Sequence, residues 1–309
     1  MLENLINMKN AIYILLAGCL WGIISIFIKV LNNIGFNSLQ CVAIRALLSA
    51  IMLFLYLFVK DKSKLRIALK DIVYFLGTGI CSIVLFNYCY FEAIELIGGA
   101  AIPALLLYTA PIFVIILSAI FFKEKITVKK IIALVMTFIG LGFVTGAFTR
   151  GEKMPLVALI LGLGSGLGYA LYSIFSKLVV DKYSETTITF YTFLVATICV
   201  FPMSGVVKNM DLLCNSKGIF ASIGLALFST VLPFLLYTKG LSKVEAGKAS
   251  ILATIEPFVA TIVGLILFHE KFTLAKIIGM VMILFAIIYL NLDCKNKRLE
   301  NMIYKNIKE

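Results

Sequence analysis

The sequence is short of charge. Only 14% of its 309 residues are Asp, Glu, Lys or Arg, whereas soluble domains carry roughly 25%. The hydrophobic fraction is 61%, and the mean hydropathy is +1.05. Even a large soluble domain leaves about a quarter of its chain surface exposed to water, so it could not hide this much apolar surface. The composition excludes a water-soluble enzyme and a disordered chain, and it predicts an integral membrane protein.

The sequence also has little of the chemistry that metal and redox sites need. It contains one histidine, His269, and its seven cysteines form no CxxC pair. Most of these cysteines lie within apolar runs, where cysteine behaves as a small apolar residue. No ATP-binding motif is visible. We therefore expect no metal, no cofactor and no catalytic residue, and we expect that the protein is not an enzyme.

Long apolar runs are what the sequence has in abundance. A helix needs about 20 mostly apolar residues to cross the hydrocarbon core. Charges and turn residues divide the chain into ten such runs, at 10–30, 37–59, 72–92, 98–122, 127–148, 154–177, 186–206, 217–238, 245–268 and 273–292. No small-residue cleavage site follows the first run, so we interpret it as a retained helix. The sequence predicts an all-α integral membrane protein with ten transmembrane helices and a basic tail at 293–309.

The basic residues predict how these helices are oriented. The net charge is +12, which in a soluble protein would suggest a nucleic-acid partner, but in a membrane protein the positions of the charges matter more. If the N-terminus is cytoplasmic, 20 of the 28 Lys and Arg residues fall in or beside inside segments and seven fall outside. We therefore predict a multi-pass protein of the cell's inner membrane with both termini in the cytoplasm, and no nucleic-acid partner.

The chain repeats itself. When residues 111–136 are set over 257–282, twelve of the 26 positions are identical, including Pro111 with Pro257 and Glu124 with Glu270. A bias toward apolar residues does not produce matched Pro and Glu-Lys positions. At an offset of 148, Ser25 meets Ser173, and Trp21 meets Tyr169. The chain is predicted to be two five-helix repeats, at 10–148 and 154–292.

Because five is odd, the second repeat enters the bilayer from the opposite side to the first. Inverted repeats give a protein two mirror-related openings around one central site, which suits alternating access. The other interpretation is a duplication that is kept only for packing.

Two stretches resemble a known family. They are the segment from Tyr90 through Ala110-Pro111 to Thr127, and its second copy, Ile255-Glu256-Pro257-Phe258 with Phe268-His269-Glu270-Lys271. Both resemble the EamA domain of the drug/metabolite transporter superfamily. The resemblance implies a bacterial inner-membrane secondary transporter, often an exporter, in which helices 1, 3, 4, 6, 8 and 9 line a central cavity. It implies a small-molecule substrate, such as an amino acid, another metabolite, a sugar or a drug. A homodimer in the lipid bilayer is a further expectation.

Glu256 stands near the middle of the run 245–268, directly before Pro257. Proline removes a backbone donor and loosens the preceding turn. Burial disfavours the charged form of a carboxyl group, and such a group is suited to bind and release a proton. Three roles stay open for Glu256: proton coupling, structural pairing with Arg45 or with a hydroxyl such as that of Thr254, and direct contact with the substrate.

Arg45 lies about eight residues into the second run, which is about 12 Å from its outer end at 1.5 Å per residue. The run around Arg45 resembles the second-helix arginine of the EamA family. A charge at such depth is costly and usually faces protein or water. Arg45 is either the counter-ion of a substrate carboxylate or a structural residue that snorkels outward or holds neighbouring helix ends. Helix 2 is not among the cavity helices that the resemblance implies, so we expect the structural role.

Other polar and aromatic residues recur on the expected cavity helices. This mixture suits an amphipathic organic solute, although each residue alone fits core packing or an interface belt better, because aromatic residues are plentiful in this chain. The candidate cavity residues are Trp21, Ser25, Asn87, Tyr88, Tyr108, Thr109, Tyr169, Ser173 and Thr254. Four prolines are expected to interrupt helices 4, 8 and 9, either as hinges or as static kinks: Pro103, Pro111, Pro233 and Pro257.

The glycine-rich start of the sixth run contains two small-xxx-small pairs, Gly162/Gly166 and Gly164/Gly168. Such pairs let helices approach closely, and no Lys-Ser or Lys-Thr follows them to make a phosphate loop. The sequence favours a secondary transporter. The alternatives are a membrane enzyme that acts on lipid, which would need a cluster of His, Asp or Glu at one depth, and a channel or scaffold that does not transport.

Overall fold

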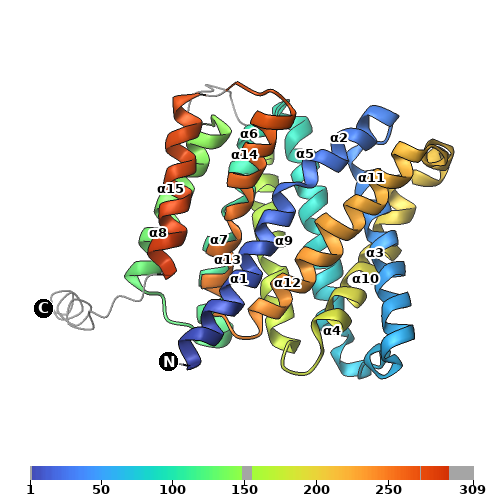
Figure 1. Ribbon diagram of the computed structural model, residues 1–309, viewed down its shortest axis with the longest axis horizontal. Helices are drawn as coiled ribbons and strands as arrows, with labels where there is room; N and C mark the ends of the chain where they lie inside the picture. Colours follow the sequence, from blue (N-terminus) through green and yellow to red (C-terminus); the bar gives the residue numbers. More distant parts are fainter. Residues whose placement is uncertain (1, 148–154, 272, 292–309) are drawn as a thin grey trace, which may run out of the picture.

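The computed structural model describes residues 2–147, 155–271 and 273–291, and these residues form a bundle of helices with no β-strand (Figure 1). Ten of its helical segments are long and apolar enough to cross a membrane, which confirms the predicted fold class. We number them as spans 1 to 10: Met8–Ile34, Ser38–Lys60, Leu69–Ile97, Ala101–Phe122, Val128–Thr145, Leu156–Val179, Glu185–Ser204, Ser216–Leu241, Ala246–Leu267 and Leu274–Asn291. The expected limits differ from these by at most five residues.

Several spans are built from more than one helical element. Span 1 contains α1 (Leu2–Gly22) and α2 (Ile24–Ile34). Span 3 joins α4 (Ile72–Leu76), a π-helical segment (Gly77–Val84) and α5 (Leu85–Ile97), and span 8 joins α11 (Ser216–Ala226), a π-helical segment (Leu227–Val231) and α12 (Leu232–Leu241). Span 4 divides into α6 (Ala101–Leu107) and α7 (Ala110–Phe122), and span 9 into α13 (Ala246–Ala253) and α14 (Ile255–Leu267). The single-helix spans are α3 (Ser38–Lys60), α8 (Val128–Thr145), α9 (Leu156–Val179), α10 (Glu185–Ser204) and α15 (Leu274–Asn291).

Side chains with oxygen acceptors begin several of these helices. Asn37 and Gln40 form a reciprocal capping box at the start of α3. Thr127 caps α8, and Ser184 caps α10, in each case by accepting a backbone N–H three residues further on. These caps satisfy amides that have no partner within the helix. The sequence therefore encodes the starts of these helices locally.

The helical irregularities follow the repeat. Spans 3 and 8 correspond to each other, and both contain a π-helical segment. Spans 4 and 9 also correspond, and both are interrupted, at Tyr108–Thr109 and at Thr254. Pro111 and Pro257 follow these interruptions and each lack the N–H that would bond back into the preceding turn. The deviations from regular helix therefore arise from equivalent positions in the two halves.

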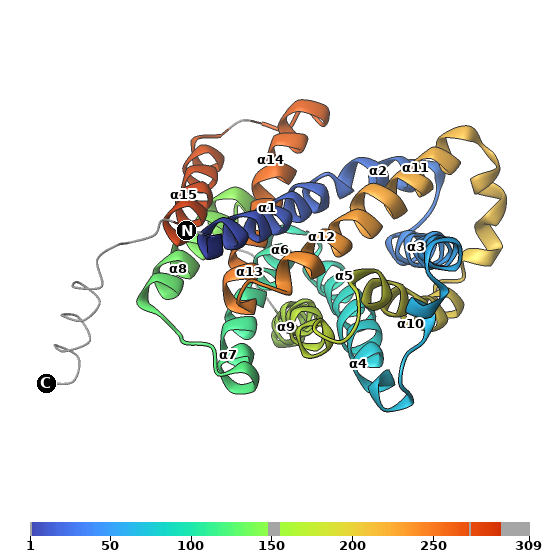
Figure 2. The same ribbon diagram turned by 60° about the horizontal axis from the view of Figure 1, so that its bottom comes forward.

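The two repeats pack against each other through pairs of helices, one from each repeat. The helix pairs α8–α15 and α3–α10 each join equivalent spans and lie at opposite ends of the bundle (Figures 1 and 2). Between them, α9 packs on α5, and α1 packs on α12, which is the same contact with the repeats reversed. The middle of the bundle is therefore built where the repeats meet.

The loops define two faces of the bundle. The basic face carries the loops at 61–71, 123–127, 180–184 and 242–245, and it lies on the side of the N-terminus, at the bottom of Figure 1. The opposite face carries the loops at 35–37, 98–100, 205–215 and 268–271. Residues 148–154, 272 and 292–309, which include the whole predicted tail at 293–309, lie outside the described residues.

Candidate functional site

A cavity lies at the centre of the bundle, where spans of both repeats meet. The space between its walls, including the open solvent at its mouth, is about 560 Å³. Its walls come from spans 1, 2, 3, 6, 8 and 9. The lining residues are Trp21, Ile24, Arg45, Ser82, Ile83, Phe86, Tyr169, Tyr172, Ser173, Phe234, Tyr237 and Glu256.

Half of the residues that line the cavity are aromatic. The ring of Trp21 lies 5.2 Å from that of Phe234 and 5.4 Å from that of Tyr237, measured between centroids. Tyr169 packs edge-on against Phe86, with the centroids 5.8 Å apart. Aromatic pairs in edge-to-face contact hold one another in fixed orientations. The cavity therefore presents a preformed apolar surface suited to the hydrophobic part of a solute.

Glu256 is the acidic group of the cavity. It lies at the start of α14, two residues after the interruption at Thr254, so the break between α13 and α14 brings its carboxylate to the centre of the bundle. The Tyr169 hydroxyl donates a hydrogen bond to Glu256 Oε2 at 3.3 Å. Among the described residues, the carboxylate therefore has a phenol hydroxyl of its own repeat as a hydrogen-bond partner.

Arg45 is the basic group of the cavity. It is 7% exposed, and its Nη2 donates a hydrogen bond to Asn87 Oδ1 at 3.4 Å. Asn87 is fixed in turn by its own amide, which donates to the Ile83 carbonyl at 2.7 Å. Arginine has five N–H donors, and among the described residues Arg45 Nε has no hydrogen-bond partner. The guanidinium therefore reaches the cavity with donor capacity to spare.

Arg45 and Glu256 line the same cavity but do not form an ion pair among the described residues, since Arg45 bonds to Asn87 and Glu256 to Tyr169. The Thr254 hydroxyl donates to the Ile251 carbonyl of its own helix. The structure thus keeps the two opposite charges in one cavity, each with neutral hydrogen-bond partners. It also differs from the expectation that helix 2 stays out of the cavity wall, because Arg45 is long enough to reach it.

Two side-chain pairs close the cavity toward the basic face. The Tyr172 and Thr238 hydroxyls are 2.7 Å apart, and the Ser173 and Tyr237 hydroxyls are also 2.7 Å apart. Both pairs join α9 to α12 near the ends of these helices at the basic face. All four side chains are buried. These hydrogen bonds form a polar floor beneath the aromatic walls.

The nine candidate cavity residues divide into three groups. Trp21, Tyr169 and Ser173 line the cavity, and Asn87 supports Arg45 from behind. Ser25, Tyr108, Thr109 and Thr254 do not line it, and the Thr109 hydroxyl donates to the Leu106 carbonyl of its own helix at 2.6 Å. Tyr88 is 50% exposed on the outer surface, because it follows Asn87 and one residue turns an α-helix by about 100°.

Seven lining residues were not among the candidates: Ile24, Ser82, Ile83, Phe86, Tyr172, Phe234 and Tyr237. Helical periodicity could have indicated two of them. Ile24 and Tyr172 each lie three residues after a candidate, Trp21 and Tyr169 respectively, on the same helical face. Ser82 and Ile83 lie in the π-helical segment of span 3, whose wider turn the sequence pattern does not reveal.

The four prolines also differ in position. Pro111 and Pro257 follow the interruptions of spans 4 and 9, and Pro233 follows the π-helical segment of span 8. Pro103 breaks nothing, because it lies in the first turn of α6, where an N–H has no acceptor within the helix.

Within the described ranges, no group of three or more His, Cys, Asp or Glu side chains could hold a metal ion. The glycines of α9 lie against two helices of the other repeat. Gly162 and Gly166 face Leu106 of α6, whereas Gly164 and Gly168 face Cys89 and Phe86 of α5. Each small-xxx-small pair therefore serves one neighbouring helix.

Comparison with known proteins gives one consistent result. An uncharacterized transporter of Archaeoglobus fulgidus is 31% identical over 280 residues, which cover 89% of this chain and 93% of the relative. The uncharacterized transporter YojE of Bacillus subtilis is 28% identical, with 87% and 88% covered, and the uncharacterized inner membrane transporter YicL of Salmonella typhimurium is 22% identical, with 94% and 97% covered. A solved structure, titled only as the crystal structure of a protein, has a TM-score of 0.72 at 15% identity and covers 93% of this chain and 95% of its own.

The family match covers both halves of the chain, at residues 8–146 and 156–292. It confirms the resemblance noted in the sequence. The chain belongs to the EamA-like transporter family.

Proposed function

We propose that this protein is a secondary active transporter that exports a small amphipathic metabolite, such as an amino acid or a drug, across the bacterial cytoplasmic membrane by alternating access. The observation that carries the proposal is the central cavity, where one buried guanidinium and one partly buried carboxylate share a space with aromatic walls. A zwitterion with an apolar body is complementary to that arrangement. Its acidic group would meet Arg45, and its cationic group would meet Glu256.

The geometry supports this assignment of roles. Arginine binds a carboxylate through a planar fork of two N–H groups, and Arg45 uses a single 3.4 Å hydrogen bond within the protein. Trp21, Phe86 and Phe234 supply the apolar surface. Glu256 also retains its alternative role, proton coupling, because a carboxyl group that binds either a proton or a cationic substrate would exchange one for the other.

The cycle that we propose uses the two inverted repeats. The cavity lies where they meet, and equivalent helices of the two repeats are interrupted at equivalent positions. Interrupted helices at a repeat interface are typical of secondary transporters. The basic face would be cytoplasmic, as its lysines favour, and the driving force would be an ion gradient or a substrate gradient.

The direct test begins with the substrate. Metabolites in the medium of a strain that overproduces the protein are compared with those of a deletion strain, and each zwitterion that differs is then tested for binding to the purified protein by thermal shift. We expect at least one compound to accumulate outside the overproducing strain and to stabilise wild-type protein more than the Arg45→Met variant. Lys208→Gln, on the surface far from the cavity, is the matched control. Equal metabolite profiles in the two strains would contradict the proposal.

A further inference from the structure

Two glutamates occupy equivalent positions in the two repeats, and each follows a backbone turn of the same kind. Glu124 follows Lys123, whose φ is 55°, and Glu270 follows His269, whose φ is 51°. These are the two non-glycine residues with positive φ among the described residues. The Glu124 N–H donates to the Ser118 carbonyl at 3.3 Å, and the Glu270 N–H donates to the Gly264 carbonyl at 3.1 Å, six residues back in both cases. A left-handed residue other than glycine is strained. The surrounding structure must therefore hold each turn in place, and each turn fixes the position of its glutamate.

The surroundings of the two carboxylates differ. Glu124 accepts the N–H of Ala246 at 2.7 Å and that of Gly247 at 3.1 Å, so it joins the first repeat to the start of α13 in the second. Its side chain is 8% exposed. Glu270 pairs with Lys276 of its own repeat at 2.6 Å, and its side chain is 49% exposed. Since the backbone turns match, the two carboxylates differ in whether they contact the other repeat: Glu124 does, and Glu270 pairs within its own repeat.

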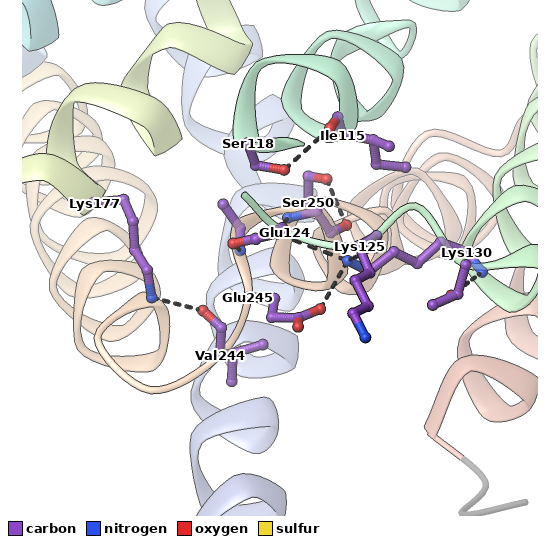
Figure 3. A network of polar contacts seen from close by, with 12 residues as sticks. Ile115, Ser118, Glu124, Lys125, Lys130, Lys177, Val244, Glu245 and Ser250 are labelled. Atoms are coloured by element: carbon purple, nitrogen blue, oxygen red, sulfur yellow. Dashed lines mark hydrogen bonds and ion pairs between the residues drawn. The ribbon is translucent and has the colours of Figure 1, made fainter. Parts of the chain in front are cut away.

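A lysine reinforces the contact on the basic face. Lys130 Nζ lies 2.7 Å from Glu245 and 3.7 Å from Glu124, and it also donates to the Lys125 carbonyl at 3.0 Å (Figure 3). Its side chain is 7% exposed. The equivalent lysine on the opposite face is Lys276, but the residue that corresponds to Glu245 is Gly99, which has no side chain. The opposite face therefore cannot form an ion pair equivalent to the one between Lys130 and Glu245.

A second pair of equivalent lysines shows the same asymmetry. Lys177, near the end of α9, donates to the Leu241 carbonyl at 2.6 Å and to the Val244 carbonyl at 3.0 Å in the loop before α13 (Figure 3). Its counterpart at an offset of 148 is Lys29, near the end of α2. Lys29 is exposed and lies over the ring of Phe268, 3.8 Å from the centroid. The α5–α6 loop, which corresponds to the loop that Lys177 holds, receives no such contact from Lys29 among the described residues.

We propose that Glu124, Lys130 and Lys177 form a latch, which holds the loop at 242–245 and the start of α13 and so keeps the basic face closed. Glu270 and Lys29 form its counterpart on the opposite face, released in this conformation. When the basic face opens, Glu270 closes on the backbone at Ala100–Ala101. This inference rests on the proposed alternating access.

The latch lies directly below the polar floor of the cavity. Lys177 is one helical turn beyond Ser173, and Leu241 is one turn beyond Tyr237 on α12. Two layers of contacts therefore separate the cavity from the basic face: the hydroxyl pairs of the polar floor and, beyond them, the latch. Because Gly99 replaces Glu245 on the other side, the basic-face latch has one ion pair more than its counterpart. The protein at rest is therefore expected to be closed at the basic face and open at the opposite face.

Cysteine accessibility tests the latch without any substrate. The native cysteines are replaced, and one reporter is added at either Ser176, one turn below the cavity floor, or Ile28, its equivalent on the opposite face. The probe is a water-soluble methanethiosulfonate reagent, applied to protein in lipid nanodiscs so that both faces are reachable. Without further change, we expect the Ile28→Cys reporter to react at least tenfold faster than the Ser176→Cys reporter, which replaces a fully buried residue.

Glu124→Ala should raise the rate of the Ser176→Cys reporter at least fivefold and lower that of the Ile28→Cys reporter. Glu270→Ala is the matched control, and it should change both rates less than twofold. If Glu124→Ala fails to give monodisperse protein, Lys177→Met removes the other arm of the latch and should shift both reporters in the same directions. Equal effects of Glu124→Ala and Glu270→Ala, or an unreactive Ser176→Cys reporter in both latch variants, would overturn the latch. Since no substrate is involved, the proposed function is tested separately by the metabolite comparison.

Discussion

The Tyr169 hydroxyl donates a hydrogen bond to Glu256 at 3.3 Å, and both residues belong to the second repeat. The equivalent residues of the first repeat are Trp21 and Ala110, which offer neither a phenol nor a carboxylate. Trp21 nevertheless stays close, with its ring centroid 6.2 Å from that of Tyr169. The inverted repeats therefore build a symmetric frame around an asymmetric site, in which the second repeat carries the acidic group.

The first prediction concerns this acidic group. Glu256→Gln keeps the size of the side chain and a hydrogen-bond acceptor for Tyr169 but removes the charge. We expect transport at equal protein level to fall about ten- to a hundredfold, because a hydrogen bond to a charged group is worth about 1.5–3 kcal/mol. Any dependence of transport on a pH gradient should disappear. Transport into inverted membrane vesicles measures both effects.

Lys208→Gln is the control for that experiment, because Lys208 lies on the exposed surface of the opposite face. It should transport at the wild-type rate. If Glu256→Gln transported as well as Lys208→Gln at every pH, the carboxylate would not be part of the transport step.

The second prediction concerns Arg45. Within the described residues its hydrogen bond to Asn87 is 3.4 Å long, close to the limit of such bonds, so Arg45 contributes little to folding through it. Arg45→Met should therefore unfold within a few degrees of wild type and bind a carboxylate substrate at least tenfold more weakly. Arg45→Lys should retain part of the binding, because lysine keeps the charge but lacks the planar fork.

A structural role for Arg45 would give the reverse result. Removal of one partner of a buried ion pair costs about 3–5 kcal/mol, so Arg45→Met would then lower the yield of folded protein, and the addition of Glu256→Ala would partly restore it. Thermal unfolding in detergent and ligand binding, measured on the same preparations, distinguish the two roles.

The sequence was sufficient to predict the membrane spans and the repeat. Apolar runs bounded by charges are a direct consequence of the bilayer, and the matched pairs Pro111/Pro257 and Glu124/Glu270 identified the two halves. The sequence also indicated Glu256, because an acidic residue in the middle of an apolar run stands out against its neighbours. These features depend on short stretches of chain, which is why they could be read without a structure.

The rest of the site depends on contacts between distant segments. Arg45 reaches the cavity from span 2 by the length of its side chain, and Phe234 and Tyr237 are ordinary aromatic residues until α12 packs against α1. The unlike surroundings of Glu124 and Glu270 could not be predicted from the repeat, because equivalent residues have equal local propensities. Their difference belongs to the conformation that the whole chain adopts.

The third prediction concerns topology. Lys64 lies in the loop at 61–71 on the basic face, and Lys208 lies at 205–215 on the opposite face; both are exposed. If the lysines of the basic face are cytoplasmic, an impermeant maleimide should label Lys208→Cys in whole cells. Lys64→Cys should be labelled only after the membrane is made permeable. Labelling of both positions from one side would contradict the inverted arrangement of the repeats.

The last prediction tests how closely the repeats must approach each other. A Cβ atom on Gly166 would lie 2.5 Å from the Thr109 hydroxyl and 2.9 Å from the Leu106 carbonyl oxygen, where backbone cannot easily move. A Cβ on Gly164, half a turn away on α9, would meet only the Cys89 side chain, with the sulfur at 3.3 Å and the Cβ at 3.9 Å. Alanine in place of glycine inside a helix is otherwise favourable by about 1 kcal/mol, so the two substitutions should differ in their effect on stability. Gly166→Ala should lower the midpoint of thermal unfolding, since overpacking costs about 1–3 kcal/mol, whereas Gly164→Ala should leave it unchanged or raise it.

Gly18 is equivalent to Gly166 and abuts the Ala253 carbonyl in the same way, so Gly18→Ala should resemble Gly166→Ala. Equal midpoints for the Gly164 and Gly166 variants would contradict the close approach of α9 and span 4 at Gly166.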